Sequence, residues 1–277
     1  MADKQRFLQL HFSRKDRLVS FISDRLFHNF TYTVRHGLIK GMKRKGGLGF
    51  LPAVFFLSAP QDSEVAFLQS LDFRGKVVYD IGAYQGIMTL FFARQARTVV
   101  AYEPQPESHQ RALENVKLNG LRNVIVLNRA VGNQEMVMSL VYDPRMQGAA
   151  TGDPRISTQI KDSLTDAITL EVPVVRLDQD IERGGLPVPD FIKIDIEGME
   201  LAALEGMRKT LAQFRPHLYL EMHGATEDEK EQRVYRIVQF LNTMGYGNIR
   251  HVETGSAIDS SNSSIARRGH LHCTASL

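Results

Sequence analysis

The feature that most constrains the fold is a regular alternation of short apolar runs with helical patterns, which begins at residue 76. The strand-like runs are residues 76–81, 98–103, 123–128, 190–196 and 217–223, and the helical patterns are 85–96, 106–118, 199–212 and 226–244. Buried strands separated by helices are typical of a parallel sheet with right-handed crossovers. The sequence therefore predicts a doubly wound α/β fold.

One long segment interrupts this alternation. Residues 135–175 form an insertion in which two strand-like stretches flank a polar loop. A loop of this length is usually mobile or functional, and it often covers a site. We therefore expect residues 143–168 to be a mobile lid that orders over a bound ligand.

The N-terminal segment differs from the rest of the chain in charge. Residues 1–47 carry eleven Lys or Arg against three Asp, so their net charge of +8 contrasts with −5 for the remainder. Apolar residues between positions 4 and 40 recur every three or four residues, which predicts one or two amphipathic helices. Such a basic arm suits nucleic acid, anionic lipid or a phosphorylated substrate, or it is a solvated face. We expect residues 1–60 to be a helical extension and residues 61–277 the main domain.

Composition excludes several classes of protein. With 43% hydrophobic and 23% charged residues, the 277-residue chain is ordinary for a globular protein. The only cysteine, Cys273, cannot form a disulfide within the chain and is a poor candidate for a nucleophile. The sequence lacks an apolar run of ~20 residues and a basic start followed by an apolar stretch, which argues against a membrane span and a secretion signal. We expect a cytoplasmic protein, in which membrane contact would be peripheral and made by the N-terminal region.

The stretch VVYDIGAYQGIMTLFFAR, residues 77–94, places a glycine loop between the first strand and the first helix. A dinucleotide fingerprint needs a further glycine between Gly82 and Gly86 to let a pyrophosphate approach, and none is present. Asp80 precedes this loop, and Glu103 ends the second strand, where a carboxylate can accept hydrogen bonds from both hydroxyls of a ribose. These features favour a cofactor with a ribose and a charged amino acid end but no phosphates, such as S-adenosylmethionine.

Polar residues alternate at the ends of the fourth and fifth strands. Asp195 and Glu197 project to one side of the fourth strand, as do Glu221 and His223 on the fifth. If the two strands are neighbours, these groups meet at one edge of the sheet, where they could bind a metal, hold an ammonium group or take a proton. Two other interpretations stay open: Glu197 caps the next helix, and His223 is a hydrogen-bonded residue at a strand end.

Five stretches taken together resemble the FkbM family of S-adenosylmethionine-dependent methyltransferases: DIGAYQGIMTLFFAR, YEPQPESHQRALENVKLNG, NRAVGN, FIKIDIEGMELAALEGM and LYLEMHG. The likeness spans residues 62–224 and implies a class I methyltransferase (Rossmann-like) fold, with a mostly parallel seven-stranded sheet and helices on both faces. It also implies methyl transfer to oxygen, commonly a hydroxyl of a sugar, polyketide or other natural product. Tyr84 stands where the family usually has Asn.

The resemblance also implies roles for single residues. Asp80, Gly82 and Gly86 match the first cofactor motif, Glu103 the ribose carboxylate, and Asp195 the acid that faces the methionine end. The full expected cofactor set is Asp80, Gly82, Ala83, Tyr84, Gly86, Glu103, Pro104, Arg129, Ala130 and Asp195. Strand alternation, rather than the resemblance, gives the expected catalytic set of Asp195, Glu221 and His223, with His223 as the base and the carboxylates orienting it or holding a divalent cation such as Mg²⁺.

The expected partner is a small-molecule acceptor, either free or carried on a glycan or a lipid, and the oligomeric state stays open. Two alternatives to this function differ in class. A nucleic-acid methyltransferase would explain the basic arm, but the sequence lacks an Asn/Asp-Pro-Pro-aromatic motif, and Cys273 is badly placed to attack a pyrimidine. A non-catalytic module that only binds the cofactor would leave the polar residues of the fourth and fifth strands without a purpose.

Overall fold

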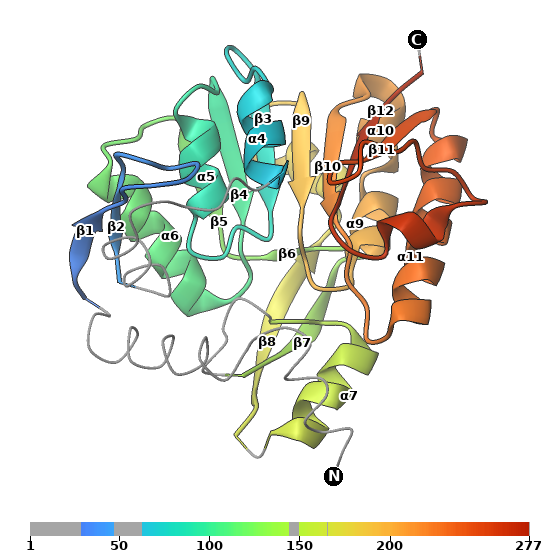
Figure 1. Ribbon diagram of the computed structural model, residues 1–277. Coiled ribbons are helices and arrows are strands. Elements are labelled where there is room, and N and C mark those ends of the chain that lie inside the picture. Colours follow the sequence, from blue (N-terminus) through green and yellow to red (C-terminus); the bar gives the residue numbers. More distant parts are fainter. Residues whose placement is uncertain (1–28, 47–62, 144–149, 165, 277) are drawn as a thin grey trace.

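The computed structural model describes residues 29–46, 63–143, 150–164 and 166–276 (Figure 1). Its centre is a seven-stranded sheet with the spatial order β11-β12-β10-β9-β3-β4-β5. The strands are β3 (Val77–Ile81), β4 (Thr98–Tyr102), β5 (Val124–Leu127), β9 (Phe191–Ile194), β10 (His217–Glu221), β11 (Asn248–His251) and β12 (His270–Thr274). All run in one direction except β12, which is antiparallel to both of its neighbours. The predicted doubly wound fold and the class I fold implied by the resemblance are confirmed.

The five strands expected from apolar runs are all present, within one or two residues at each end. The last two strands, β11 and β12, were not visible in the sequence pattern. Their residues alternate between buried and partly exposed positions, and β12 reads HLHCT. A short, half-buried strand of this composition contains no continuous apolar run, so periodicity alone does not separate it from a loop.

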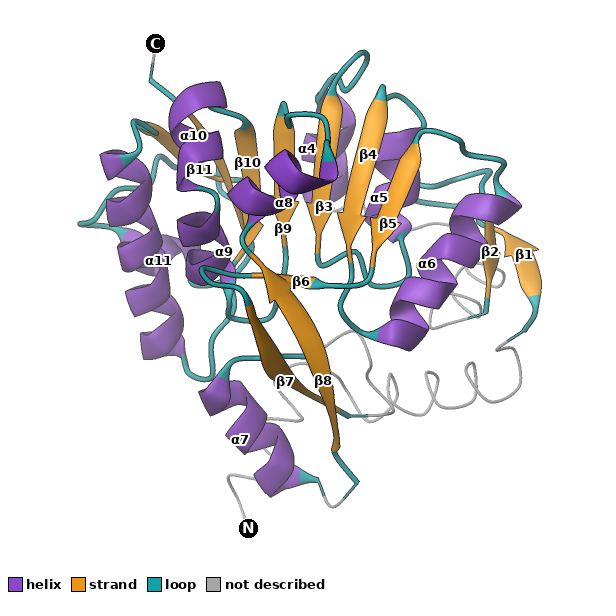
Figure 2. Cartoon of the chain, turned by 180° about the vertical axis from the view of Figure 1, so that it is seen from behind, coloured by secondary structure: helices purple, strands orange, loops and turns teal. Residues whose placement is uncertain are grey.

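Helices cover both faces of the sheet (Figure 2). On β3, Val77, Tyr79 and Ile81 pack toward one layer of helices and Val78 packs toward the other, as expected for a strand buried on both faces. The first layer contains α8 (Leu177–Gly184), α9 (Glu200–Gly206), α10 (Arg208–Phe214) and α11 (Glu227–Thr243), and the second contains α4 (Ser63–Ser70), α5 (Ile87–Ala93) and α6 (Pro106–Leu118). A short 3-10 turn, η2 (Ser263–Ala266), precedes β12. None of the described helices is long and apolar enough to cross a bilayer.

The single helix expected over residues 199–212 is divided into α9 and α10. The break lies at Gly206 and Met207. A Cβ atom on Gly206 would lie 1.9 Å from the carbonyl oxygen of Gly132, so the chain passes too close for any side chain at this position. The division therefore results from a tertiary contact that helical periodicity does not reveal.

The insertion and the residues just before it form a small sheet below the main sheet (Figure 1). Its order is β6-β8-β7, from β6 (Ala130–Val131), β7 (Met136–Tyr142) and β8 (Ile168–Val175), which confirms the two strand-like stretches. The intervening segment was expected to be a polar loop, but it contains α7 (Pro154–Ser163). Asp153 caps this helix and Pro154 occupies its first turn, and an Asp-Pro pair is equally typical of a turn. Residues 144–149 and 165 are not described, and motion of a lid stays a prediction.

The expectation of helices over residues 4–40 is wrong for the described part of that range. Residues 29–46 form an antiparallel hairpin of β1 (Thr31–Thr33) and β2 (Lys43–Lys45). Gly37 and Gly41 both adopt positive φ in the turn region between the strands, and Tyr32 and Val34 alternate inward onto the α4–α6 side of the core. The expected helices before residue 29, and the connection over residues 47–62, lie outside the described residues.

Candidate active site

The glycine loop joins β3 to α5 and packs directly against the end of β9. A Cβ atom on Gly82 would lie 1.8 Å from the carbonyl oxygen of Asp195, so only glycine fits there. The amides of Gly82 and Ala83 both donate to the carbonyl of Tyr102, each at 3.0 Å. The loop is therefore fixed to the carboxyl ends of the two strands on either side of β3, the region where an open α/β sheet binds its ligand.

Glu103 occupies the position expected for a ribose carboxylate. It is 6% exposed, and its two oxygens accept one hydrogen bond each, from the amides of Tyr84 (2.7 Å) and Gln105 (2.9 Å). Each oxygen keeps a second lone pair for a further donor. Burial raises the pKa of Glu103 to about 7, although the two amide bonds favour the charged form.

Tyr84, the residue that departs from the family pattern, adopts a left-handed backbone with φ of 48°. This region suits Gly or Asn and is unusual for a bulky residue. Its amide hydrogen bond to Glu103 and the amide contacts of the preceding residues hold the loop in this form. The side chain of Tyr84 lines the cavity described next.

A cavity of about 210 Å³ opens at this end of the sheet. Six of the expected cofactor residues line one part of it: Gly82, Tyr84, Glu103, Pro104, Arg129 and Ala130. Asp195, also expected there, lines the part where β9 and β10 end. Residues of the insertion, including Met138, Leu140 and Val174, form an apolar wall. The insertion therefore contributes directly to the site.

Three of the expected cofactor residues do not line this cavity: Asp80, Ala83 and Gly86. Asp80 is fully buried, accepts a hydrogen bond of 2.6 Å from Thr89, and lies 3.5 Å from the Lys193 ammonium. Gly86 precedes α5 with φ of 83° and packs against Ala112. These residues shape the loop in the structure, and a direct contact with the cofactor stays a prediction for them.

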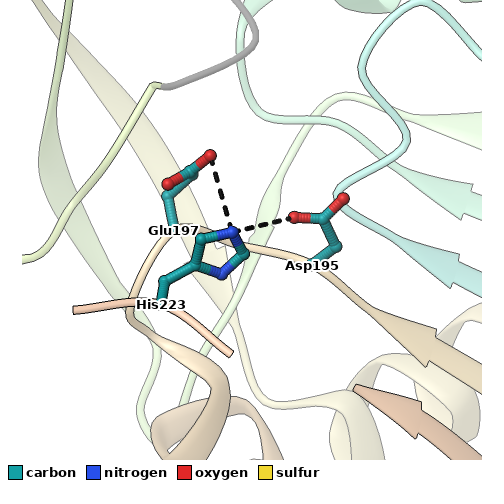
Figure 3. Close-up of side chains that lie close together, drawn as sticks. All are labelled: Asp195, Glu197 and His223. Carbon is teal, nitrogen blue, oxygen red and sulfur yellow. Dashed lines mark ion pairs between the residues drawn. The ribbon is translucent and has the colours of Figure 1, made fainter. Parts of the chain in front are cut away.

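The polar groups of β9 and β10 do meet, as the alternation predicts. The strands are parallel neighbours with Ile194 opposite Leu220. His223 Nε2 lies 3.7 Å from a carboxylate oxygen of Asp195 and 3.7 Å from one of Glu197 (Figure 3). It also lies 3.6 Å from a carboxylate oxygen of Glu221. One imidazole thus sits among three carboxylates at the edge of the cavity.

His223 has a fourth acidic neighbour that the sequence did not reveal. Its Nδ1 donates to Glu200 at 2.9 Å, and Glu200, only 1% exposed, also accepts from the Gly198 amide. Burial opposes the charged ring, but Glu197 and Glu200 outweigh it and raise the pKa of His223 well above its usual value. The carboxylates therefore favour the protonated ring, and the hydrogen bond to Glu200 fixes its orientation.

Glu197 was left out of the expected catalytic set, yet the structure places it in the cavity. It does not cap the next helix: Met199 is the N-cap residue of α9, without a side-chain hydrogen bond. Its φ of 52° is left-handed, a strained conformation that is common at functional sites. Burial raises the pKa of Glu197 to about 7. The Glu-Gly pair after an apolar strand was the available signal, because glycine lets the chain turn at that point.

Asp195 is paired with a buried lysine that the sequence analysis did not single out. The Lys193 ammonium lies 3.0 Å from Asp195 and donates to the Gly82 carbonyl at 3.1 Å. Burial opposes ionisation of Asp195, but Lys193 outweighs it, so the pKa of Asp195 is lowered. Lys193 thus links the glycine loop to an ionised carboxylate at the end of β9.

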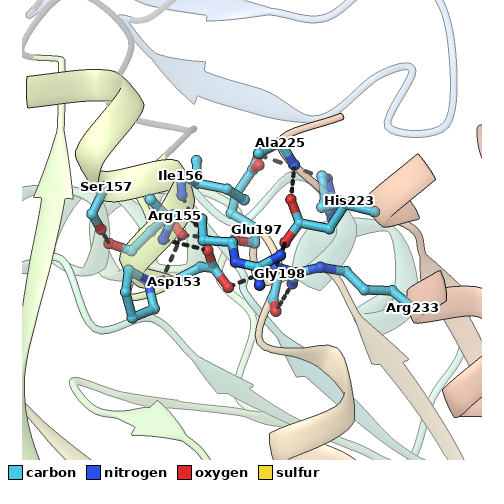
Figure 4. A network of polar contacts seen from close by, with 12 residues as sticks. Asp153, Arg155, Ile156, Ser157, Glu197, Gly198, His223, Ala225 and Arg233 are labelled. Carbon is cyan, nitrogen blue, oxygen red and sulfur yellow. Dashed lines mark hydrogen bonds and ion pairs between the residues drawn. The ribbon is translucent and has the colours of Figure 1, made fainter. Parts of the chain in front are cut away.

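A second polar network lies behind the site and joins the insertion to it (Figure 4). Arg233 of α11 bonds Asp153 and Glu229, both at 2.7 Å, and the carbonyl of Gly198. Asp153 caps α7, and Glu229 accepts from the amide of Ala225, two residues after His223. One arginine therefore connects α7, the Glu197–Gly198 turn and the loop that follows β10.

Known proteins are similar to this chain over the region that contains the site. The family model described as "Methyltransferase FkbM domain" matches residues 80–247. The chain is 28% identical over 151 residues to the hexuronic acid methyltransferase AglP of Haloferax volcanii, covering 54% of this chain and 57% of that protein. It is 25% identical over 167 residues to an uncharacterized protein of Methanocaldococcus jannaschii, covering 60% of this chain and 56% of that one. The chain thus spans little more than half the length of these relatives.

Among solved structures, an FkbM methyltransferase from Methylobacillus flagellatus is similar with a TM-score of 0.48 and 18% identity. The match covers 74% of this chain and 45% of that one.

Proposed function

The chain belongs to the FkbM methyltransferase family, and from this premise we propose that it is an S-adenosylmethionine-dependent enzyme that methylates a hydroxyl oxygen of a sugar or other small natural product. The observation that carries the proposal is that one cavity reaches both Glu103 and the Asp195–Glu197–His223 cluster. The first is suited to a ribose and the second to an ammonium group and a reacting hydroxyl.

In this proposal, different residues at the cofactor end of the cavity bind different parts of S-adenosylmethionine. Glu103 has one spare lone pair on each oxygen for the ribose hydroxyls, and Asp195, kept ionised by Lys193, faces the amino acid end. S-adenosylmethionine supplies the methyl group from a sulfonium, so the protein mainly has to provide proximity and a proton acceptor. The left-handed Tyr84 and Gly82 hold the loop between these two carboxylates.

We assign proton removal to Glu197 rather than to His223. A histidine that already carries its proton cannot take another, and four surrounding carboxylates favour that charged form. Glu197 has a pKa of about 7 and faces the same cavity, which suits a general base at neutral pH. His223 then orients Glu197 and balances its charge, and Glu221 holds His223 from the other side.

A divalent cation is the alternative arrangement for this end of the site. Asp195, Glu197 and His223 each offer a ligand atom, and these atoms lie within 4.8 Å of one another. A cation there would require a neutral His223 and would lower the pKa of the acceptor hydroxyl directly. A chelator abolishes turnover in this arrangement and has no effect when Glu197 acts alone.

The acceptor class follows from the cavity and from one relative. The insertion supplies an apolar wall opposite the polar strand ends, which suits a ring with one hydrophobic face and one hydroxylated edge. The hexuronic acid methyltransferase AglP acts on a sugar derivative, which supports a carbohydrate acceptor here. Sugars free or carried on a glycan or lipid are all compatible with this chemistry.

The test is the formation of S-adenosylhomocysteine by the purified protein with a panel of neutral sugars, hexuronic acids and polyketide aglycones, with and without added tRNA. We expect turnover with one of the small acceptors and no increase with tRNA. Turnover only with tRNA would support a nucleic-acid methyltransferase. Binding of the cofactor without turnover on any acceptor would favour a non-catalytic module.

A further inference from the structure

The N-terminal hairpin contains a buried arginine with an unusual environment. Arg44, at the centre of β2, is only 4% exposed. Within the described residues no carboxylate lies at ion-pair distance from it, and its guanidinium instead donates to the side-chain oxygen of Gln85 at 2.9 Å. Burying a guanidinium against a neutral partner is costly. Arg44 also interacts with the phenol of Tyr32, its partner across the hairpin, which is likewise neutral. The remaining inward residues of the hairpin are apolar, so packing alone does not explain an arginine at this position.

The partner of Arg44 belongs to the glycine loop. Gln85 is itself buried, and its side-chain amide donates to the hydroxyl of Tyr84 at 3.1 Å. Tyr84 is the left-handed residue whose backbone amide bonds Glu103 and whose side chain lines the cavity. A continuous path of hydrogen bonds therefore runs from Arg44 through Gln85 to the most strained residue of the loop.

The hairpin is also fixed to α6, which both overall views place beside it (Figures 1 and 2). Asn119 exchanges two hydrogen bonds of 2.8 Å with the backbone of Lys43. Asn115 accepts from the amide of Lys45 at 2.9 Å and donates to the carbonyl of Gln85 at 2.9 Å. The strand that carries Arg44 thus has a second, independent link to the same loop residue.

We propose that Arg44 is a positioning residue for the cofactor loop, so that docking of the N-terminal hairpin and binding of the cofactor stabilise each other. This inference rests on the proposed function, because it takes the cavity beside Tyr84 to be the cofactor site. Without Arg44, the side chain of Gln85 loses its partner and no longer holds the hydroxyl of Tyr84 in place. Tyr84 then leaves its left-handed backbone conformation, and its amide no longer donates to Glu103. The hairpin is then part of the cofactor site, although it lies outside the matched family domain.

The test is calorimetric titration of S-adenosylhomocysteine into Arg44→Met and Gln85→Met, with Lys45→Met as the matched control on the same strand. Lys45 forms an ion pair of 3.2 Å with Glu114 and does not touch the loop through its side chain. We expect about tenfold weaker binding in each of the first two variants, which corresponds to one lost buried hydrogen bond, and less than twofold change in Lys45→Met. The double variant should bind no more weakly than either single variant, because the two side chains act through one bond.

Thermal unfolding of the ligand-free variants separates positioning from general stability. An Arg44→Met protein that melts at a lower temperature yet binds S-adenosylhomocysteine like the wild type would overturn the inference, as would strictly additive effects in the double variant. If Arg44→Met does not fold, Gln85→Met decides, and full affinity in that variant also overturns the inference. A wild-type protein that binds no S-adenosylhomocysteine contradicts the proposed function itself.

Discussion

Glu103 holds the glycine loop and, in the proposed function, also binds the ribose of the cofactor. Its oxygens accept hydrogen bonds from the amides of Tyr84 and Gln105, and the residue lines the cavity. Deleting the side chain therefore removes a ligand contact and releases the loop together. A glutamine keeps one acceptor oxygen and the shape of the side chain, so it separates the loss of charge from the loss of support.

We predict that Glu103→Gln weakens S-adenosylhomocysteine binding by roughly 1–3 kcal/mol, the usual loss for charge-assisted hydrogen bonds. Because the pKa of Glu103 is about 7, the wild type should also bind more tightly at pH 8 than at pH 6, and the variant should lose this dependence. Calorimetry at the two pH values measures both effects. Glu107→Gln, on the first turn of α6 and outside the cavity lining, is the control. Unchanged affinity in Glu103→Gln would remove Glu103 from the cofactor site.

A second prediction concerns which residue of the Glu197–His223 pair accepts the proton. If Glu197 takes the proton, the rate of methyl transfer rises with pH through about 7, as the carboxylate ionises. Glu197→Gln should lower kcat on the order of 10²- to 10⁴-fold and abolish this rise. The measurement is S-adenosylhomocysteine formation with the acceptor found by screening, with and without a chelator. If Glu197→Gln retains the wild-type rate and pH profile while His223→Asn does not, the base is His223.

At the end of the site formed by β9 and β10, the residues could be predicted from the sequence only where strand periodicity fixes the direction of the side chain. Asp195, Glu221 and His223 follow two buried strands, so alternation brought them to one edge, and the structure confirms that they meet. Glu200 and Lys193 were missed because nothing in a sequence tells a buried ion partner from a solvated one. The left-handed turn at Glu197 also depends on tertiary contacts, among them the hydrogen bond of 2.7 Å from Thr151 to its carbonyl.

At the scale of elements, ion pairs connect helix α7 of the insertion to α11 of the main domain. Asp153 at the start of α7 forms an ion pair of 2.7 Å with Arg233, whose side chain is 14% exposed. Arg233 also pairs with Glu229 at 2.7 Å. Arg155 pairs with Glu229 as well, at 3.4 Å, but the side chain of Arg155 is 72% exposed. These two arginines share an acidic partner and differ in burial, so they form a matched pair for measuring what the network contributes.

We predict that Arg233→Met destabilises the protein by about 3 kcal/mol, because it leaves Asp153 buried without its cation and Glu229 with only the exposed Arg155. Arg155→Met should change stability by less than about 1 kcal/mol, as is usual for an exposed ion pair. Hydrogen exchange across α7 should accelerate in the first variant and not in the second. Urea unfolding gives the free energies, and equal effects of the two substitutions would contradict a central role for Arg233.

The elements that could be predicted are those with long apolar runs or clear helical periods. The five central strands and α6 and α11 lie where the sequence placed them, within a residue or two. The hairpin at residues 31–45 was mistaken for helix because Phe30 and Val34 are four residues apart, a spacing that fits a helical period over so short a stretch. The helix α7 was missed because its capping Asp-Pro pair equally signals a turn.

At the scale of the whole molecule, His270 lies among carboxylates that come from elements far apart in the sequence. His270 on β12 lies 2.6 Å from Glu253, 3.5 Å from Glu64 of α4 and 3.6 Å from Glu221 of β10, and its ring stacks on Tyr219. Burial opposes its charge, but these carboxylates raise the pKa of His270 to about 9. His272 lies two residues further along β12, and burial lowers its pKa to about 4.

These opposite shifts predict how global stability depends on pH. The pKa of His270 is about 6.5 in the unfolded chain and about 9 in the folded protein, so between these two pH values the folded protein keeps a proton that the unfolded chain has lost. The stabilisation that results, on the order of 3 kcal/mol, is fully present below pH 6.5 and is lost as the pH rises through about 9. The melting temperature should therefore fall from pH 6.5 to pH 9. His270→Gln should flatten this decline, leaving the part due to His223, whereas His272→Gln should leave it intact and instead stabilise the protein below pH 6.5. A decline as steep in His270→Gln as in the wild type would show that the carboxylates around His270 do not hold its proton.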